Sequence, residues 1–322
     1  MPGASGSAAL SQARRAPALD IALAGLIGLV LTGLVFTGSG AASGAEGGTA
    51  VGRDAVGRDA VGRGAYVFRA AGCAGCHTDP KRKHEPLAGG PALETPFGTF
   101  YAPNISPDPE YGIGRWSDAD FLRALREGLA PDGRHYYPVF PYPSYSGMSE
   151  RDALDLKAYI FSLAPVARPN RPHEVSFPFE FRFLLGAWKA LYFAPARFAP
   201  DPGRDAQWNR GAYLVEHLGH CGACHTPRGF LGAKDQDRKL AGNPKGPGGK
   251  KVPNITPDPE DGIGRWRASD LTYYLKTGFR PDGDVAGGAM SGVIEDATAH
   301  LSDADRAAIA AYLSSLSPIP RQ

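Results

Sequence analysis

Two short segments of one pattern contain all four cysteines of the chain, Cys-Ala-Gly-Cys-His at 73–77 and Cys-Gly-Ala-Cys-His at 221–225. This pattern is typical of covalent c-type haem attachment. Two thiols add to the vinyl groups of one haem, and the adjoining imidazole binds the iron. A structural zinc site or a disulfide pair fits less well, because the segments lie far apart and each ends in histidine. We therefore predict two covalently bound haem c groups, held by the thiols of Cys73, Cys76, Cys221 and Cys224, with His77 and His225 as iron ligands.

The composition agrees with two small domains that are each completed by a porphyrin. The chain has 322 residues, which corresponds to about two domains. Its formal net charge of +2 gives no case for nucleic-acid binding. Glycine and proline are abundant, 42 and 29 residues, and no run of alternating apolar and polar residues indicates a strand. We predict a loop-rich, mainly α fold.

The chain also contains an internal repeat, which indicates a duplicated domain with one haem in each copy. Two copies are too few for a solenoid. The repeated segments are Arg-Gly-Ala-Tyr at 63–66 and 210–213, Asn-Ile-Ser/Thr-Pro-Asp-Pro-Glu at 104–110 and 254–260, and Gly-Ile-Gly-Arg-Trp at 112–116 and 262–266.

Three helices are predicted around each haem. The first helix runs toward the cysteines, over 64–71 and 211–218. The second begins at Ser117, where an aspartate three residues later resembles a capping box, and its counterpart begins near Asp270. The third begins at Ser149 and at Ser302, again with an aspartate three residues on, and a proline ends each of these helices.

The opposite face of each iron requires a sixth ligand, for which methionine is the first candidate. After the initiator only Met148 and Met290 remain, one in each copy, and His/Met ligation suits electron transfer. His135 is the alternative to Met148 at the first iron. Arginine and tryptophan side chains both donate hydrogen bonds, so the repeated pairs are candidate neighbours of the haem propionates. These pairs are Arg115 with Trp116 and Arg265 with Trp266.

The N-terminus is predicted to direct the chain across the cytoplasmic membrane. Arg14 and Arg15 precede an apolar stretch over 21–36, which predicts that both haem domains face the periplasm. We interpret this stretch as a retained anchor, with a cleaved signal peptide as the alternative. A low-complexity repeat of Val-Gly-Arg-Asp-Ala follows and predicts a flexible tether.

Two further segments are candidates for contacts. Aromatic residues crowd the stretch over 177–193, which has three interpretations: it packs between the haem domains, lies in a membrane interface, or docks on a dehydrogenase. A basic loop before Asn254 is interpreted either as a docking site for an acidic partner or as a solvated insertion. Its basic residues are Lys234, Arg238, Lys239, Lys245, Lys250 and Lys251.

From about Arg63 to Pro318 the chain resembles the membrane-bound periplasmic dihaem cytochromes c and the cytochrome c subunits of alcohol and gluconate dehydrogenases. The resemblance rests on both pentapeptides, on Pro-Asn-Ile-Ser-Pro-Asp-Pro at 103–109 with Gly-Ile-Gly at 112–114, on Phe-Pro-Tyr-Pro-Ser-Tyr at 140–145, and on Asn-Arg-Gly-Ala-Tyr-Leu at 209–214. The dehydrogenase subunits typically carry three haems, and many have methionine where this chain has Phe140.

The resemblance implies two tandem class I cytochrome c-like haem domains after an N-terminal membrane or signal segment. It further implies an electron carrier without catalytic activity of its own, with a periplasmic dehydrogenase as donor and a respiratory-chain acceptor. The alternative is a haem enzyme, such as a dihaem peroxidase or a thiosulfate-oxidising cytochrome. The predicted parts are a signal or anchor over 1–37, a tether over 38–62, haem domains over 63–168 and 206–320, and the aromatic-rich linker over 169–205.

Overall fold

The computed structural model describes residues 59–320, so the predicted anchor and most of the tether lie outside the described residues. Within the described residues, both pentapeptides belong to one compact unit. Within the described range, no helix is long and apolar enough to span a bilayer.

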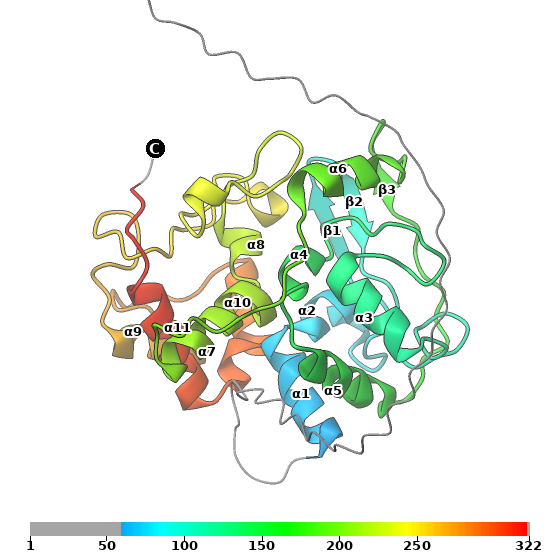
Figure 1. The fold of residues 1–322 in the computed structure, drawn as a ribbon, viewed down its shortest axis with the longest axis horizontal. Coiled ribbons are helices and arrows are strands. Elements are labelled where there is room, and N and C mark those ends of the chain that lie inside the picture. Colours follow the sequence, from blue (N-terminus) through cyan, green and yellow to red (C-terminus); the bar gives the residue numbers. More distant parts are fainter. Residues whose placement is uncertain (1–58, 321–322) are drawn as a thin grey trace, which may run out of the picture. The chain divides into compact units, whose positions relative to one another are not determined.

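Each copy packs its first helix against its last, as Figure 1 shows for α1 with α5 and for α7 with α11. The helices of the first copy and the linker are α1 (Ala60–Ala70), α2 (Cys73–His77), α3 (Asp118–Glu127), α4 (Tyr142–Tyr145), α5 (Glu150–Phe161) and α6 (Leu184–Tyr192). Those of the second copy are α7 (Ala206–Tyr213), α8 (Gly222–His225), α9 (Ala268–Thr277), α10 (Ala289–Asp296) and α11 (Asp303–Ser314). A π-helical turn (Leu214–Leu218) extends α7, and short 3₁₀ turns cover Pro80–Arg82, Gln236–Arg238, Pro247–Gly249 and Thr298–His300.

The predicted helix starts are confirmed where serine caps the helix. The Ser117 hydroxyl accepts a hydrogen bond from the Asp120 N–H, and the Asp120 carboxylate accepts one from the Ser117 N–H. The Ser149 and Ser302 hydroxyls cap α5 and α11 by accepting hydrogen bonds from the N–H groups of Asp152 and Asp305. Such caps satisfy N–H groups that lack partners inside the helix, which is why they mark the boundary locally.

A small antiparallel sheet, which no alternating run in the sequence indicated, lies beside the helices of the first copy. Its strands are β1 (Ala92–Thr95), β2 (Gly98–Tyr101) and β3 (Glu174–Val175), in the order β1-β2-β3. Strands this short cannot display an alternating pattern. The third strand also comes from the linker, far from its partner in the sequence. The fold remains mainly helical.

The glycine of the Arg-Gly-Ala-Tyr motif is required where the first and last helices cross. A Cβ at Gly64 would lie 1.8 Å from the Asp155 carbonyl oxygen, and one at Gly211 would lie 2.0 Å from that of Ala308. Both separations are shorter than any real Cβ contact, so only glycine permits this close crossing. The two cores are continuous, with buried residues of both copies in one apolar cluster.

The aromatic linker packs on both copies through one side of α6. The ammonium group of Lys189 donates hydrogen bonds to the carbonyl oxygens of Glu127 and Gly128, and burial lowers its pKa to about 8. The indole N–H of Trp188 donates to the carbonyl oxygen of Leu231 in the second copy. On this side of α6, the linker therefore packs between the two haem domains, which was the first of its three interpretations. Elsewhere on the linker large apolar side chains are exposed, including Phe177, Phe183 and Leu191.

Candidate functional site

The two attachment histidines have the same hydrogen bond. Nδ1 of His77 lies 2.8 Å from the carbonyl oxygen of Pro103, and Nδ1 of His225 lies 2.8 Å from that of Pro253. A carbonyl only accepts, so Nδ1 carries the proton and Nε2 keeps its lone pair. Histidine ligands are commonly oriented by such a bond from the other ring nitrogen. Both imidazoles are thus held in the tautomer that binds an iron through Nε2.

The loop that carries each proline carbonyl is tied to the chain beyond the last helix. The Asn104 side-chain amide donates to the carbonyl oxygen of Val166 and accepts from the Ser106 N–H. Asn254 donates to the carbonyl oxygen of Ile319 and accepts from the Thr256 N–H. Both asparagines are buried, so the repeated Asn-Ile-Ser/Thr segment holds the proline carbonyl in place beside the histidine.

A residue with a left-handed backbone conformation precedes each attachment helix. Gly72 has φ 63°, and His220 has φ 38° directly before Cys221. Glycine adopts this region readily, whereas a histidine there is strained. The His220 ring packs edge-on against Tyr145 of the first copy, with ring centroids 5.5 Å apart, and the Tyr145 hydroxyl donates to the carbonyl oxygen of Ala71. Tyr145 therefore contacts both the residue before the second motif and the segment that leads into the first.

All four motif cysteines are free thiols, as covalent attachment requires. Burial raises the pKa of Cys73 and of Cys221 to about 12. The pKa of Cys76 is also raised, by burial and then by the neighbouring Cys224. The second cause places a thiol of one motif near a thiol of the other. The donor set of each motif, two free thiols and an Nε2 lone pair, fits haem c.

The three candidates for the sixth ligands lie in different surroundings. Met148 is 1% exposed in the shared core, and its N–H donates to Tyr145, whose hydroxyl donates to the carbonyl oxygen of Ala71. Met290 lies at the start of α10, partly buried against the same core. His135 packs near α6, and its buried Nδ1 has no hydrogen-bond partner in the described structure.

The repeat gives Met148 a counterpart other than Met290. Met148 directly precedes the cap Ser149, and Leu301 directly precedes the cap Ser302; both are buried. The methionines of the two copies therefore occupy different positions in the repeat.

The predicted propionate neighbours lie at the surface or at the edge of the core. Arg115 is exposed, and Arg265 pairs with Glu260 at 2.7 Å. Trp116 and Trp266 are partly buried against the core, and Trp266 meets Tyr274 edge-on with centroids 5.3 Å apart. Within residues 59–320, neither indole N–H has a hydrogen-bond acceptor, so both remain able to donate.

Some basic side chains of the loop have partners within the protein, and others are exposed to solvent. Lys239 pairs with Glu216 at 2.8 Å, and the Arg238 guanidinium donates to the carbonyl oxygen of Pro320. Lys245, Lys250 and Lys251 are exposed. The loop also contacts the first copy, because its 3₁₀ turn at Pro247–Gly249 packs against β1.

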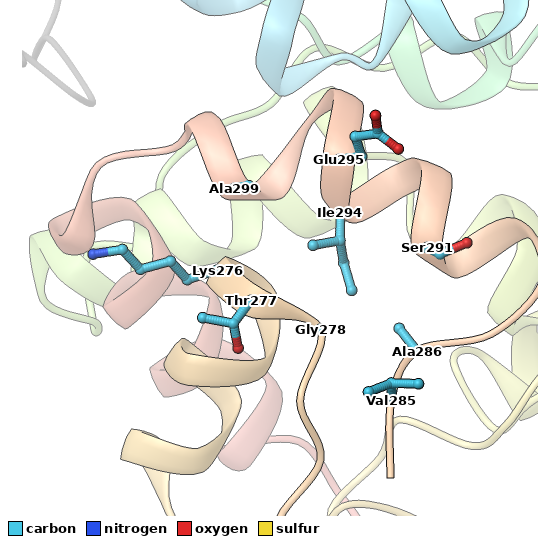
Figure 2. A pocket seen from close by; sticks show the side chains of 9 residues that line it. All are labelled: Lys276, Thr277, Gly278, Val285, Ala286, Ser291, Ile294, Glu295 and Ala299. Carbon is cyan, nitrogen blue, oxygen red and sulfur yellow. The ribbon is translucent and has the colours of Figure 1, made fainter. Parts of the chain in front are cut away.

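An open pocket of about 280 Å³ is lined by α9, α10 and the chain between them. In Figure 2, Ile294 of α10 points into the space between Thr277 and Ala286. Its lining contains no cysteine, histidine or methionine, so it is unsuited to attaching haem c.

Sequence reasoning missed the groups that orient the predicted histidine ligands. Pro103 and Pro253 precede the repeated asparagines, and their recurrence at one place in both copies was a usable signal. Tyr145 and His220 had no comparable signal, because their contact joins the two copies.

A family model for cytochrome c matches residues 61–164 and 209–317. The chain belongs to the cytochrome c family. It is 49% identical over 253 residues to a protein named dihaem cytochrome c-type from Cereibacter sphaeroides, covering 78% of this chain and 83% of that protein. It is 45% identical to one of the subunits of nicotinate dehydrogenase from Pseudomonas putida, covering 80% of this chain and 21% of that one. It is 42% identical to the cytochrome c subunit of a quinone alcohol dehydrogenase from Komagataeibacter europaeus, covering 80% and 56%.

Each matched region contains one attachment motif. The chain is therefore a c-type cytochrome with two covalently bound haem c groups, and it transfers electrons. The predictions of the cofactor and of a mainly helical fold with two cytochrome c regions are confirmed.

Proposed function

We propose that this cytochrome accepts electrons from a periplasmic dehydrogenase and passes them from haem to haem toward the respiratory chain. The names of its relatives support a dehydrogenase partner, because several are subunits of nicotinate, alcohol, fructose or gluconate dehydrogenases. The arginines and apolar stretch near the N-terminus support a periplasmic location with a membrane anchor.

The observation that carries this proposal is the closeness of the two attachment motifs. α10 of the second copy contacts α2 of the first, and Cys224 of the second motif contributes to the raised pKa of Cys76 in the first. A side chain added at Gly75 in α2 would lie 3.3 Å from the Asp296 carboxylate at the end of α10. This arrangement favours relay between two haems over two independent sites.

For the irons we propose the pairs His77 with Met148 and His225 with Met290. The position of Met148 in the core beside Tyr145 and the attachment segment supports it over His135, which packs toward α6. We also propose that Arg115, Trp116, Arg265 and Trp266 donate to the propionates. Their unused N–H donors at the core edge support this role, except that Arg265 would first have to release Glu260.

The test is reduction of the purified full-length protein by candidate dehydrogenases in the presence of their substrates. Nicotinate, alcohol, fructose and gluconate dehydrogenases lacking their own cytochrome are each mixed with the oxidised protein, and haem reduction is followed in the visible spectrum. We expect rapid reduction of both haems by one of them and low-spin irons that do not bind cyanide. Reduction by none of them, with a high-spin, cyanide-binding iron, would contradict the proposal and indicate a haem enzyme.

A further inference from the structure

The tyrosine of the first Arg-Gly-Ala-Tyr motif reaches across to the other copy. The Tyr66 hydroxyl donates to Oδ2 of Asp305 at 2.6 Å and accepts from the Ser302 N–H at 3.0 Å. Ser302 and Asp305 are the cap and the third residue of α11. A residue of α1 thus contributes to the N-terminus of the last helix of the second copy.

The second copy makes the same contact in the opposite direction. The Tyr213 hydroxyl donates to Oδ2 of Asp152 at 2.5 Å and accepts from the Ser149 N–H at 3.1 Å. Ser149 and Asp152 are the cap and third residue of α5. Contacts in which each partner uses the same surface on the other are typical of a two-fold arrangement.

The rest of the motif acts within its own copy, which explains why the tyrosine is the residue that crosses. Arg63 makes a two-point hydrogen bond to Asp155, and Arg210 makes one to Asp305. The glycines allow the close helix crossing described above. With arginine and glycine fixing the first helix on the last, the tyrosine is presented at a defined place toward the other copy.

Both contacts suit a fixed joint. Tyr213 is 2% exposed and Asp305 is 7% exposed, so water competes weakly for these hydrogen bonds. Burial and then the Asp305 carboxylate raise the pKa of Tyr66 to about 12, which keeps the phenol protonated as a donor. Hydrogen bonds to charged groups are the stronger class in proteins. Two such bonds at separate points resist rotation of one copy against the other.

We propose that Tyr66 and Tyr213 are positioning residues that lock the two haem domains in one mutual orientation and thereby set the rate of electron transfer between the haems. The helices that carry them lead directly into the attachment motifs, so a shift at either joint moves a haem relative to the other. The rate part of the proposal rests on the proposed relay from haem to haem.

The test uses Tyr66→Phe, Tyr213→Phe and the double variant of the holoprotein. Losing one hydrogen bond to a charged group favours the unlocked arrangement by roughly tenfold or more. Soret circular dichroism reports the mutual orientation of two haems through their exciton couplet, and pulse reduction reports the transfer rate between them. We expect a weaker couplet and a slower transfer in each single variant, and a larger loss in the double variant, with unchanged midpoint potentials.

Tyr312→Phe is the matched control, because Tyr312 donates to the Glu216 carboxylate at the same 2.6 Å but within one copy. It should lower the melting temperature without changing the couplet. Asp152→Asn keeps an acceptor for Tyr213 and should retain most of the couplet. If both single variants keep the wild-type couplet and rate, the proposal is wrong. The couplet requires no electron donor, so it separates a failure of the joint from a failure of the proposed function.

Discussion

Replacing Gly211 by alanine tests whether the close crossing of α7 and α11 holds the second copy together. The added Cβ would lie 2.0 Å from the Ala308 carbonyl oxygen and 2.7 Å from the Tyr312 Cβ. Neither neighbour is the free end of a flexible side chain. The helices must therefore separate by about 1 Å to restore a normal contact.

The magnitude follows from two opposing effects. Overpacking of this kind costs about 3 kcal/mol, at the upper end of the usual range, because backbone must move. Alanine recovers about 1 kcal/mol through its better helix propensity. The net loss is about 2 kcal/mol, which for a unit of this size lowers the melting temperature by roughly 4 to 8 °C.

The assay is thermal unfolding of the holoprotein, followed by circular dichroism and by Soret absorbance. Gly292→Ala is the control, because this glycine also lies inside a helix but has no atom within 4 Å of an added Cβ. It should raise stability by about 1 kcal/mol. Equal melting temperatures for the two variants would refute the argument from the helix crossing.

Three further predictions concern pH, ligands and salt. Burial, followed by Arg182, lowers the pKa of His173 below its ordinary 6.5, and its Nδ1 accepts the Tyr101 N–H. Between the lowered pKa and 6.5 the unfolded chain binds more protons than the folded one, so the free energy of unfolding falls as the pH drops through this window. The free energy of unfolding of His173→Gln should depend less on pH there. An equal pH dependence of the variant and the wild type would contradict this role of His173. Met290→Ala should remove about half of the thioether-to-iron charge-transfer absorption and Met148→Ala the remainder, whereas complete loss in Met290→Ala alone would exclude Met148 and indicate His135. Electron exchange with an acidic partner should slow by roughly tenfold at high salt or after Lys250→Glu with Lys251→Glu, and a rate indifferent to both would assign the exposed lysines to a solvated loop.

The predictions that the comparisons and the structure confirm depend on chemistry between residues close together in the chain. The attachment motif places two thiols and an imidazole within one turn, so its function is readable without a fold. The serine caps are equally local, because Ser117 and Asp120 satisfy each other's backbone groups three residues apart. Duplication is visible because the same local requirements recur in order.

The features that only the tertiary structure decided join residues far apart in sequence. Tyr66 and Asp305 are separated by 239 positions, and nothing in the type of either residue identifies the other as its partner. The sheet depends on a strand from the linker, and each attachment histidine depends on a proline carbonyl in another loop. A residue's type fixes which contacts it can make, but its partner depends on how the whole chain packs. The sequence by itself therefore determined that two haems are attached, whereas the packing determined how the ligands and the two haem domains are held.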